Sequence, residues 1–487
     1  MRVAALVVVA VLVTPLASGF DFIKVVDTDT QVPGKTEKFL YFGAPSLNRD
    51  GAIVFCGAGS GPTGLYTSIG GELRVVADAG TPIPGQTTTF AHGFRSYGAS
   101  IDGETIAFYA FTQSTELGGG VYLWKDGHVT CIADMSTPVP GGTATFNSIE
   151  DAFGFGPFSH PALAGEDVAF RASADNPRQR GVYARVGGKL DVVADLTMPV
   201  PSGTGNFSFL GAEISMLGGR VAFRAEGFDL QRGIYTNLTG PLAKVVDKTD
   251  PIPGGTGTFT SVNYPWFDAG KIFFTGEGQD GQQGLYAWDG ASLSVIVDRS
   301  TAIPEGTGTF ADYQFNRSQP SSDGGKVLFR AVGAGGQEGI YLKGLGTSIK
   351  VIDTSDELDG KSIVSLTTGP QTSRAGRFGF LAGFADGSSG IYIAVAPFLR
   401  GDSNLDGSID LSDALKILFF LFVTENSGHS CQKSLDADDT GNIGITDTIW
   451  LLRYLFLSGP PPSQPCPACG VDETPDDLTC ERAGACS

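Results

Sequence analysis

Basic residues, histidine and long apolar runs are all scarce in this chain. Its formal net charge is −19, from 33 Lys and Arg against 52 Asp and Glu. Proteins that bind nucleic acids contact phosphates with clustered lysine and arginine, so this balance argues against that class of function. The 4 histidines are never closely spaced, which argues against a zinc centre built on histidine.

The N-terminus carries the most extended apolar stretch, at residues 3–13, preceded by Arg2 and followed by the small residues 17–19. This order is typical of a secretory signal peptide with its cleavage site. The stretch is too short to span a bilayer, although an anchor helix or a buried strand is an alternative interpretation. We therefore expect residues 1–19 to be a signal peptide, and the protein to be secreted, extracellular or at the cell surface, and not transmembrane.

Cysteine is scarce outside the C-terminal end. The last 57 residues contain five of the 7 cysteines, namely Cys431, Cys466, Cys469, Cys480 and Cys486. In an oxidising compartment such spacing predicts disulfides, although the last four could also form a four-thiolate zinc site. Because seven is odd, at least one thiol stays unpaired. Cys56 and Cys131 lie in apolar strand patterns and are interpreted as buried small side chains.

Internal repetition sets the organisation of the chain. One motif, for example KVVDKTDPIPGGTGTF from Lys244, recurs seven times at intervals of 51 to 61 residues. Its aspartates are Asp27, Asp78, Asp134, Asp195, Asp247, Asp298 and Asp353. Two further elements keep the same register: an apolar run with a phenylalanine, as at Phe223, and a Gly-aliphatic-Tyr run, as at Tyr235.

Each repeat contains three short β-rich runs and a more variable run after its Thr-Phe, separated by Gly, Asp or Pro turn signals. Four strands per unit of about 50 residues, seven times over, predict an all-β seven-bladed propeller across residues 20–397. A β-solenoid is the alternative, but its period is normally shorter. The chain enters on the run at residues 23–27 and lacks a matching last strand after Tyr392, so we expect the N-terminal strand to complete the last blade.

The repeated aspartates and Pro-Gly turns are interpreted as linkers between blades, since Asp can bond to its own turn backbone, with a ring of calcium-binding carboxylates as the alternative. Function is expected where the repeats differ, in the inner strands after the Thr-Phe. Aromatic faces beside carboxylates and amides suit sugar rings, although these could also be ordinary strand and loop residues. The candidate ligand-binding residues are His92, Tyr97, Asp151, His160, Glu213, Tyr264, Trp266 and Tyr313.

After residue 397 the composition becomes acidic, and two twelve-residue segments, at residues 402–413 and 436–447, match a calcium loop. Each has oxygen side chains at positions 1, 3, 5 and 12, a glycine at position 6 for the sharp turn and a backbone carbonyl at position 7, as calcium coordination requires. The predicted metal ligands, with calcium as the cofactor, are Asp402, Asn404, Asp406, Ser408, Asp410, Asp413, Asp436, Asp438, Thr440, Asn442 and Asp447. The first segment offers more carboxylates, so we expect it to bind calcium more tightly.

The last ligand of each segment is Asp, and an apolar helical pattern follows each segment while none precedes it. This pattern resembles the dockerin type I domain over residues 400–459. The resemblance implies a small all-α, EF-hand-like domain, a cohesin-like or cell-surface partner, and a place in extracellular polysaccharide breakdown. Residues 460–487 form a tail rich in Pro and Cys.

The helical patterns at residues 412–423 and 446–457 are apolar around most of their circumference. One face of each helix should therefore meet the propeller, the tail or a partner, and burial against the protein itself is the expectation. We predict a secreted binding or scaffold-docked protein that could also bind a glycan. The alternative is a propeller glycoside hydrolase or lyase that uses channel carboxylates.

Overall fold

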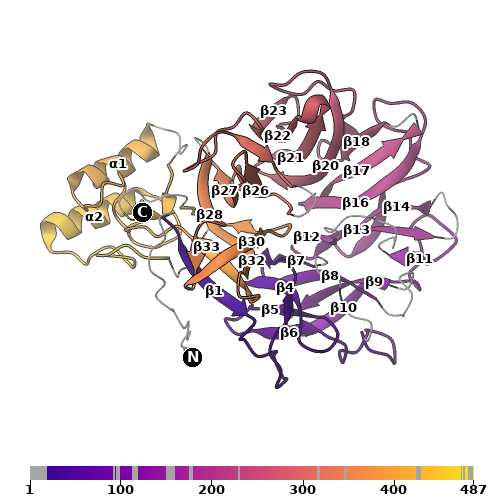
Figure 1. Ribbon diagram of the computed structural model, residues 1–487, viewed down its shortest axis with the longest axis horizontal. Helices are drawn as coiled ribbons and strands as arrows, with labels where there is room; N and C mark the ends of the chain where they lie inside the picture. Colours follow the sequence, from indigo (N-terminus) through magenta and orange to yellow (C-terminus); the bar gives the residue numbers. More distant parts are fainter. Residues whose placement is uncertain are drawn as a thin grey trace.

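The computed structural model describes residues 19–90, 94, 99–111, 119–149, 160–174, 179–228, 231–314, 318–344, 348–423, 429–472, 474, 476, 478–480 and 486. Within them, the strands form seven antiparallel sheets around a common centre, with two helices to one side (Figure 1). The predicted seven-bladed propeller is therefore confirmed.

The first blade comprises β2 (Tyr41–Phe42), β3 (Ser46–Leu47), β4 (Ile53–Ala58), β5 (Gly64–Thr67) and β6 (Arg74–Ala77). The second comprises β7 (Ala99–Asp102), β8 (Thr105–Phe111), β9 (Gly119–Lys125) and β10 (His128–Ala133). The third comprises β11 (Phe146–Ile149), β12 (Ala162–Ala164), β13 (Asp167–Ala174), β14 (Gly181–Val186) and β15 (Lys189–Asp195). The fourth blade comprises β16 (Phe207–Leu217), β17 (Arg220–Gly227), β18 (Arg232–Thr236) and β19 (Ala243–Asp247). The fifth comprises β20 (Phe259–Asp268), β21 (Lys271–Gly278), β22 (Gln283–Trp288) and β23 (Leu293–Asp298).

The sixth blade comprises β24 (Phe310–Asp312), β25 (Ser321–Asp323), β26 (Lys326–Gly333), β27 (Glu338–Lys343) and β28 (Ser348–Asp353). The seventh comprises β29 (Glu357–Leu358), β30 (Lys361–Thr367), β31 (Ser373–Arg374), β32 (Arg377–Phe384), β33 (Ser389–Val395) and β1 (Asp21–Asp27). Strand β1 pairs antiparallel with β33, with Ile23 opposite Ile393. The two ends of the propeller sequence thus share one sheet.

The repeated aromatic residues form the core of each blade. In the fifth blade Phe259 lies edge-on to Tyr286, with ring centroids 5.0 Å apart, and Phe274 stacks on the same tyrosine at 5.7 Å. In the seventh blade Ile363 stands at the first position, and Phe384 contacts Tyr392 edge-on. The repetition in the sequence is therefore a repetition of core packing.

The repeated aspartates hold the turns between blades. The Asp27 carboxylate accepts hydrogen bonds from the Thr30 hydroxyl at 2.8 Å and the Asp29 amide at 3.0 Å. Asp78 and Asp247 accept equivalent bonds from their own turns. The interpretation of these residues as linkers is thus confirmed.

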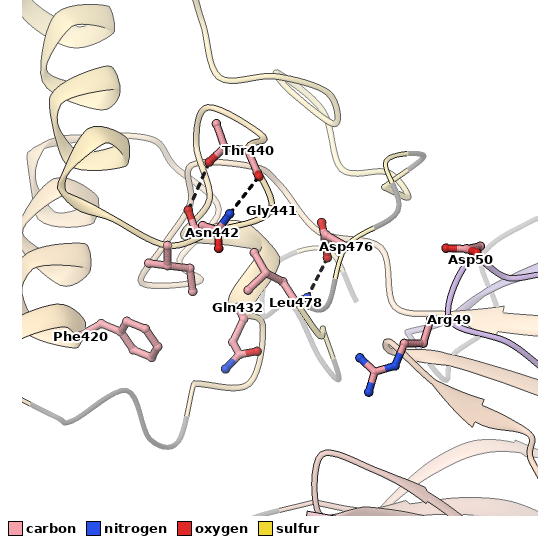
Figure 2. A pocket seen from close by; sticks show the side chains of 10 residues that line it. Arg49, Asp50, Phe420, Gln432, Thr440, Gly441, Asn442, Asp476 and Leu478 are labelled. Atoms are coloured by element: carbon pink, nitrogen blue, oxygen red, sulfur yellow. Dashed lines mark hydrogen bonds between the residues drawn. The ribbon is translucent and has the colours of Figure 1, made fainter. Parts of the chain in front are cut away.

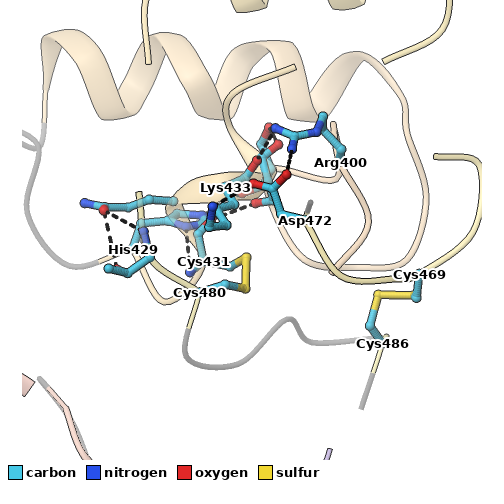
Figure 3. The surroundings of a disulfide bond; sticks show 12 residues. Arg400, His429, Cys431, Lys433, Cys469, Asp472, Cys480 and Cys486 are labelled. Atoms are coloured by element: carbon cyan, nitrogen blue, oxygen red, sulfur yellow. Dashed lines mark hydrogen bonds and ion pairs between the residues drawn. A yellow bond between two sulfur atoms is a disulfide. The ribbon is translucent and has the colours of Figure 1, made fainter. Parts of the chain in front are cut away.

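The C-terminal part departs from the prediction of an all-α, EF-hand-like domain. Among the described residues after 397, its α-helices are two short ones, α1 (Leu411–Phe422) and α2 (Ile445–Leu457), with one 3₁₀ turn, η4 (Gln432–Ser434). The remainder is irregular chain, fastened by the disulfides Cys431–Cys480 and Cys469–Cys486 (Figure 3). The prediction was wrong because two short helices bury too little apolar surface to form a domain alone.

The tail connects this part to the propeller. Phe398 and Gly470 form an isolated bridge, and the Lys326 ammonium donates to the Thr479 hydroxyl at 2.5 Å. Cys431 and Cys480 belong to the apolar core that contains Phe378 of β32. The C-terminal part therefore packs against the sixth and seventh blades.

The outer sides of the helices are exposed, contrary to the expected burial. Large apolar side chains that remain open to solvent are Leu411, Leu415, Phe419, Phe422, Val423, Ile445, Ile449, Phe456 and Leu457. Ala414, Ile417 and Leu451 face inward. No helix in the described ranges is both long and apolar enough to cross a membrane.

Candidate functional site

The first acidic segment, residues 402–413 (loop 1), wraps around its first and last carboxylates. Asp402 accepts the amides of Asp406 at 3.0 Å and Gly407 at 2.8 Å. Asp413 accepts the amides of Asn404 at 3.0 Å and Asp410 at 2.9 Å. Loop 1 is therefore closed by its own backbone.

The second segment, residues 436–447 (loop 2), repeats this pattern position by position. Asp436 accepts the amides of Thr440 at 3.0 Å and Gly441 at 2.9 Å. Asp447 accepts the amides of Asp438 at 3.2 Å and Gly444 at 2.8 Å. Both loops thus hold a carboxylate at position 1 and another at position 12, and all four of these side chains are buried.

The carboxylates are gathered more closely in loop 2. Oxygen atoms of Asp436, Asp438 and Asp447 all lie within 4.8 Å of one another. Asp438 Oδ1 is buried, and no described residue forms a hydrogen bond to it. In the described part of the chain, loop 1 forms no such group. There the Asp410 carboxylate caps α1 through the Ser412 amide at 2.7 Å, and the Asn404 amide group donates to Asp406 at 2.8 Å.

The other predicted ligands lie on the outer turns of the loops. The Ser408 amide donates to the Asp406 carboxylate at 2.9 Å, and the Thr440 hydroxyl donates to the Asn442 carbonyl at 3.4 Å. Carboxylates, hydroxyls and carbonyls are hard oxygen donors, which fit a calcium ion.

Both loops contain carboxyl groups that resist ionisation. Burial raises the pKa of Asp413 to about 6. Burial, followed by repulsion from Asp438 and Asp436, raises the pKa of Asp447 to about 7. A bound cation would remove this cost by compensating the negative charge.

In the propeller, His92, Tyr97 and Asp151 lie outside the described residues. His160 is buried, with Nδ1 2.9 Å from the Ser100 hydroxyl, and burial lowers its pKa to about 4. Trp266 donates from Nε1 to the Ser322 hydroxyl at 2.8 Å, and the buried Tyr313 donates to the Asp298 carbonyl at 2.6 Å. The hydrogen bonds named here hold these three side chains against neighbouring parts of the propeller.

Glu213 and Tyr264 are brought together from neighbouring blades around Arg224. Arg224 lies 3.7 Å from the Glu213 carboxylate and 2.7 Å from that of Glu226, and its guanidinium lies 5.6 Å from the centroid of the Phe209 ring. Tyr264 has a left-handed backbone, with φ of 49°. Burial, followed by the charge of Glu213, raises the pKa of Tyr264.

We call Phe209, Glu213, Arg224 and Tyr264 the blade 4 cluster. Sequence reasoning missed Arg224 and Phe209. A signal for Arg224 existed, because an arginine follows the repeated core phenylalanine in three blades, at Arg171, Arg224 and Arg330.

Comparison with known proteins gives a family for the propeller. A model described as "Family of unknown function (DUF7453)" matches residues 17–153 and 150–361. This chain belongs to that family. The DUF7453 match ends before α1 and α2, so the two acidic loops lie outside it.

Solved structures similar to this DUF7453 protein have low sequence identity to it. The β-propeller domain of the Trilobed protease from Pyrococcus furiosus is 10% identical, covers 74% of this chain and 94% of its own, and has a TM-score of 0.43. Oligogalacturonate lyase from Vibrio parahaemolyticus is 15% identical, with 78% and 97% coverage and a TM-score of 0.40. No curated protein matches the chain. At these levels no function is transferred to this protein.

Proposed function

We propose that this protein is an exported binding protein whose C-terminal part docks to a partner in a calcium-dependent manner. The observation that carries the proposal is the matched folding of the two loops, together with the three carboxylates gathered in loop 2. Export is supported by the signal-like N-terminal sequence and by the two disulfides, which persist in oxidising compartments.

The docking surface consists of the outer sides of α1 and α2. Equivalent positions of the two helices are exposed to similar degrees: Leu415 and Ile449 are 57% and 49% exposed, and Phe422 and Phe456 are 71% and 63% exposed. Apolar and aromatic side chains of this kind anchor protein interfaces. The partner that fits is a protein with an apolar surface, such as a cohesin-like or another cell-surface protein.

In this proposal the propeller binds a glycan and places the protein in extracellular polysaccharide breakdown. The blade 4 cluster supports this role, because an aromatic ring beside a carboxylate, an arginine and a tyrosine can stack on and hydrogen-bond to a sugar. Binding is favoured over hydrolysis because Arg224 is ion-paired with both nearby carboxylates, Glu213 and Glu226. Product analysis on any glycan that binds would reveal a hydrolase or a lyase.

Titration calorimetry with calcium on the full chain tests the proposal. Asp402→Asn in loop 1 and Asp447→Asn in loop 2 should each remove one equivalent of bound calcium. Asp289→Asn, in an exposed propeller turn, is the control and should leave the stoichiometry unchanged. Unchanged calcium binding in both loop variants would overturn the metal assignment.

Docking is tested with a panel of purified cohesin modules and cell-surface proteins, in calcium or in EGTA. The double variant Leu415→Ser/Ile449→Ser should lose calcium-dependent binding while still binding calcium itself. Binding that persists in EGTA or in the double variant would contradict the proposed surface.

A further inference from the structure

A buried cluster of charges joins loop 2 to the tail. Arg400 lies 2.9 Å from carboxylate oxygens of both Asp439 and Asp472. Lys433 lies 2.6 Å from Asp472 and 2.8 Å from Asp476. Figure 3 shows Arg400 and Lys433 converging on Asp472.

The charges in this cluster do not balance. Asp436, Asp439, Asp472 and Asp476 supply four carboxylates, and Arg400 and Lys433 supply the two cations that pair with them. Arg377, which donates to the Asp472 carbonyl at 3.3 Å, adds a third buried cation, so the carboxylates still outnumber the cations by one. Arg400 is fully buried, and the side chain of Asp472 is 3% exposed, so solvent compensates little of the excess. Buried charge without a counter-ion is costly.

Asp476 supplies an independent indication of a missing cation. Its side chain is 4% exposed, and Oδ1 accepts from Lys433 and from the Leu478 amide. Oδ2 is buried and has no hydrogen-bond partner among the residues that the structure describes. Figure 2 shows Asp476 beside the Gly441 turn of loop 2. Oxygen atoms of Asp436, Asp439 and Asp476 all lie within 4.8 Å of one another.

Loop 1 provides an internal comparison. At its fourth position stands Leu405, with φ of 64°, and at the fourth position of loop 2 stands Asp439, with φ of 58°. Leu405 packs against the apolar core, whereas Asp439 accepts the Thr474 hydroxyl from the tail at 2.8 Å. The same backbone thus places an apolar contact in one loop and a carboxylate in the other.

We propose that an additional calcium ion binds between loop 2 and the tail, on Asp436, Asp439 and Asp476. A bound cation would compensate the excess negative charge, and three carboxylate oxygens from an irregular segment suit the flexible coordination of calcium better than the strict octahedron of magnesium. The inference rests on the proposed function only in that Asp436 also belongs to loop 2. Asp439 and Asp476 are not among the predicted ligands of either loop.

The test counts calcium bound per full chain by equilibrium dialysis and elemental analysis. The unaltered chain should bind three equivalents. Asp476→Asn, which keeps the size of the side chain and the acceptor for the Leu478 amide, should bind two. Asp439→Leu, which copies loop 1, should also bind two. Asp50→Asn, a nearby exposed residue of the propeller, should bind three.

The outcomes separate this inference from the proposed function. If the unaltered chain binds two calcium ions, and the Asp476→Asn and Asp439→Leu variants also bind two each, the additional site is overturned. That result would leave the calcium sites of the two loops unaffected. A single equivalent that is lost in these two variants, but kept in Asp402→Asn and Asp447→Asn, would support the additional site and overturn the loops. Native disulfides and an unchanged melting temperature of the propeller verify that each variant is folded.

Discussion

The propeller and the C-terminal part are stabilised in different ways. In the propeller, each blade repeats an aromatic core, such as Phe207, Phe223 and Tyr235, in which every ring is buried. Among the described residues of the C-terminal part, the central apolar cluster has six buried members, and Arg400 and Lys433 are buried in the same part of the chain. Where apolar burial is small, ion pairs, disulfides and the proposed calcium ions have to supply the stability.

The two regions should therefore respond to different perturbations. Repetition makes the propeller depend on its ring being complete, because every blade is packed between two others. The C-terminal part should instead depend on covalent links and on cations.

The largest effect is expected from deletion of residues 21–27, which form β1. The deletion leaves β33 as an unpaired edge and removes the buried Phe22 and Val26, so the propeller should aggregate or melt at a markedly lower temperature. Lys24→Ala, on the same strand but partly exposed, is the control. If the truncated chain melts at the same temperature as the full chain, closure by β1 does not stabilise the ring.

Removal of disulfides should affect the C-terminal part and leave the propeller transition in place. The double variant Cys431→Ala/Cys480→Ala opens a link of sequence separation 49, and Cys469→Ala/Cys486→Ala opens one of 17. Each should cost roughly 2–5 kcal/mol, and the longer link should cost about 1 kcal/mol more, because it constrains more of the unfolded chain. Scanning calorimetry measures both transitions. Equal losses, or a shift of the propeller transition alone, would contradict this division.

Acid should destabilise the propeller through His160. Burial lowers its pKa from 6.5 to about 4, so the folded state favours the neutral ring. The stability that depends on neutral His160 is fully present above pH 6.5 and is lost as the pH falls toward 4, by about 3 kcal/mol in total. His160→Asn should remove this part of the pH dependence in denaturant titrations. If the variant loses stability at low pH to the same extent as the unaltered protein, His160 does not cause this loss.

The smallest effect is expected at a single turn between blades. Asp195→Ala removes the acceptor of the Thr197 amide and hydroxyl and should cost roughly 1 kcal/mol. Asp191→Ala, four residues earlier on an exposed strand position paired with Lys189, should cause no measurable change. The stability of the two variants is compared through their denaturant midpoints. Equal midpoints would show that the repeated aspartate adds nothing to stability.

The sequence by itself determined the propeller. A blade is a local unit, so its strands, its aromatic core and its aspartate turn all lie within about 50 residues and recur with one period. The two acidic loops were visible for the same reason, because twelve consecutive residues contain all their side chains. Asp410, however, caps α1 in the structure, a role that follows from the position at which the helix begins.

Only the tertiary structure decided the contacts between segments that occur once. Trp266 and Tyr313 have the composition of a sugar-binding surface, yet Ser322 and the Asp298 carbonyl hold them in the core. The C-terminal part is not an all-α domain, because Arg400 and the disulfide Cys431–Cys480 tie the tail between helices and propeller. A contact between two non-repeated segments that lie far apart in the sequence produces no periodic pattern. It can therefore be recognised only from the packing and the charges of the folded chain.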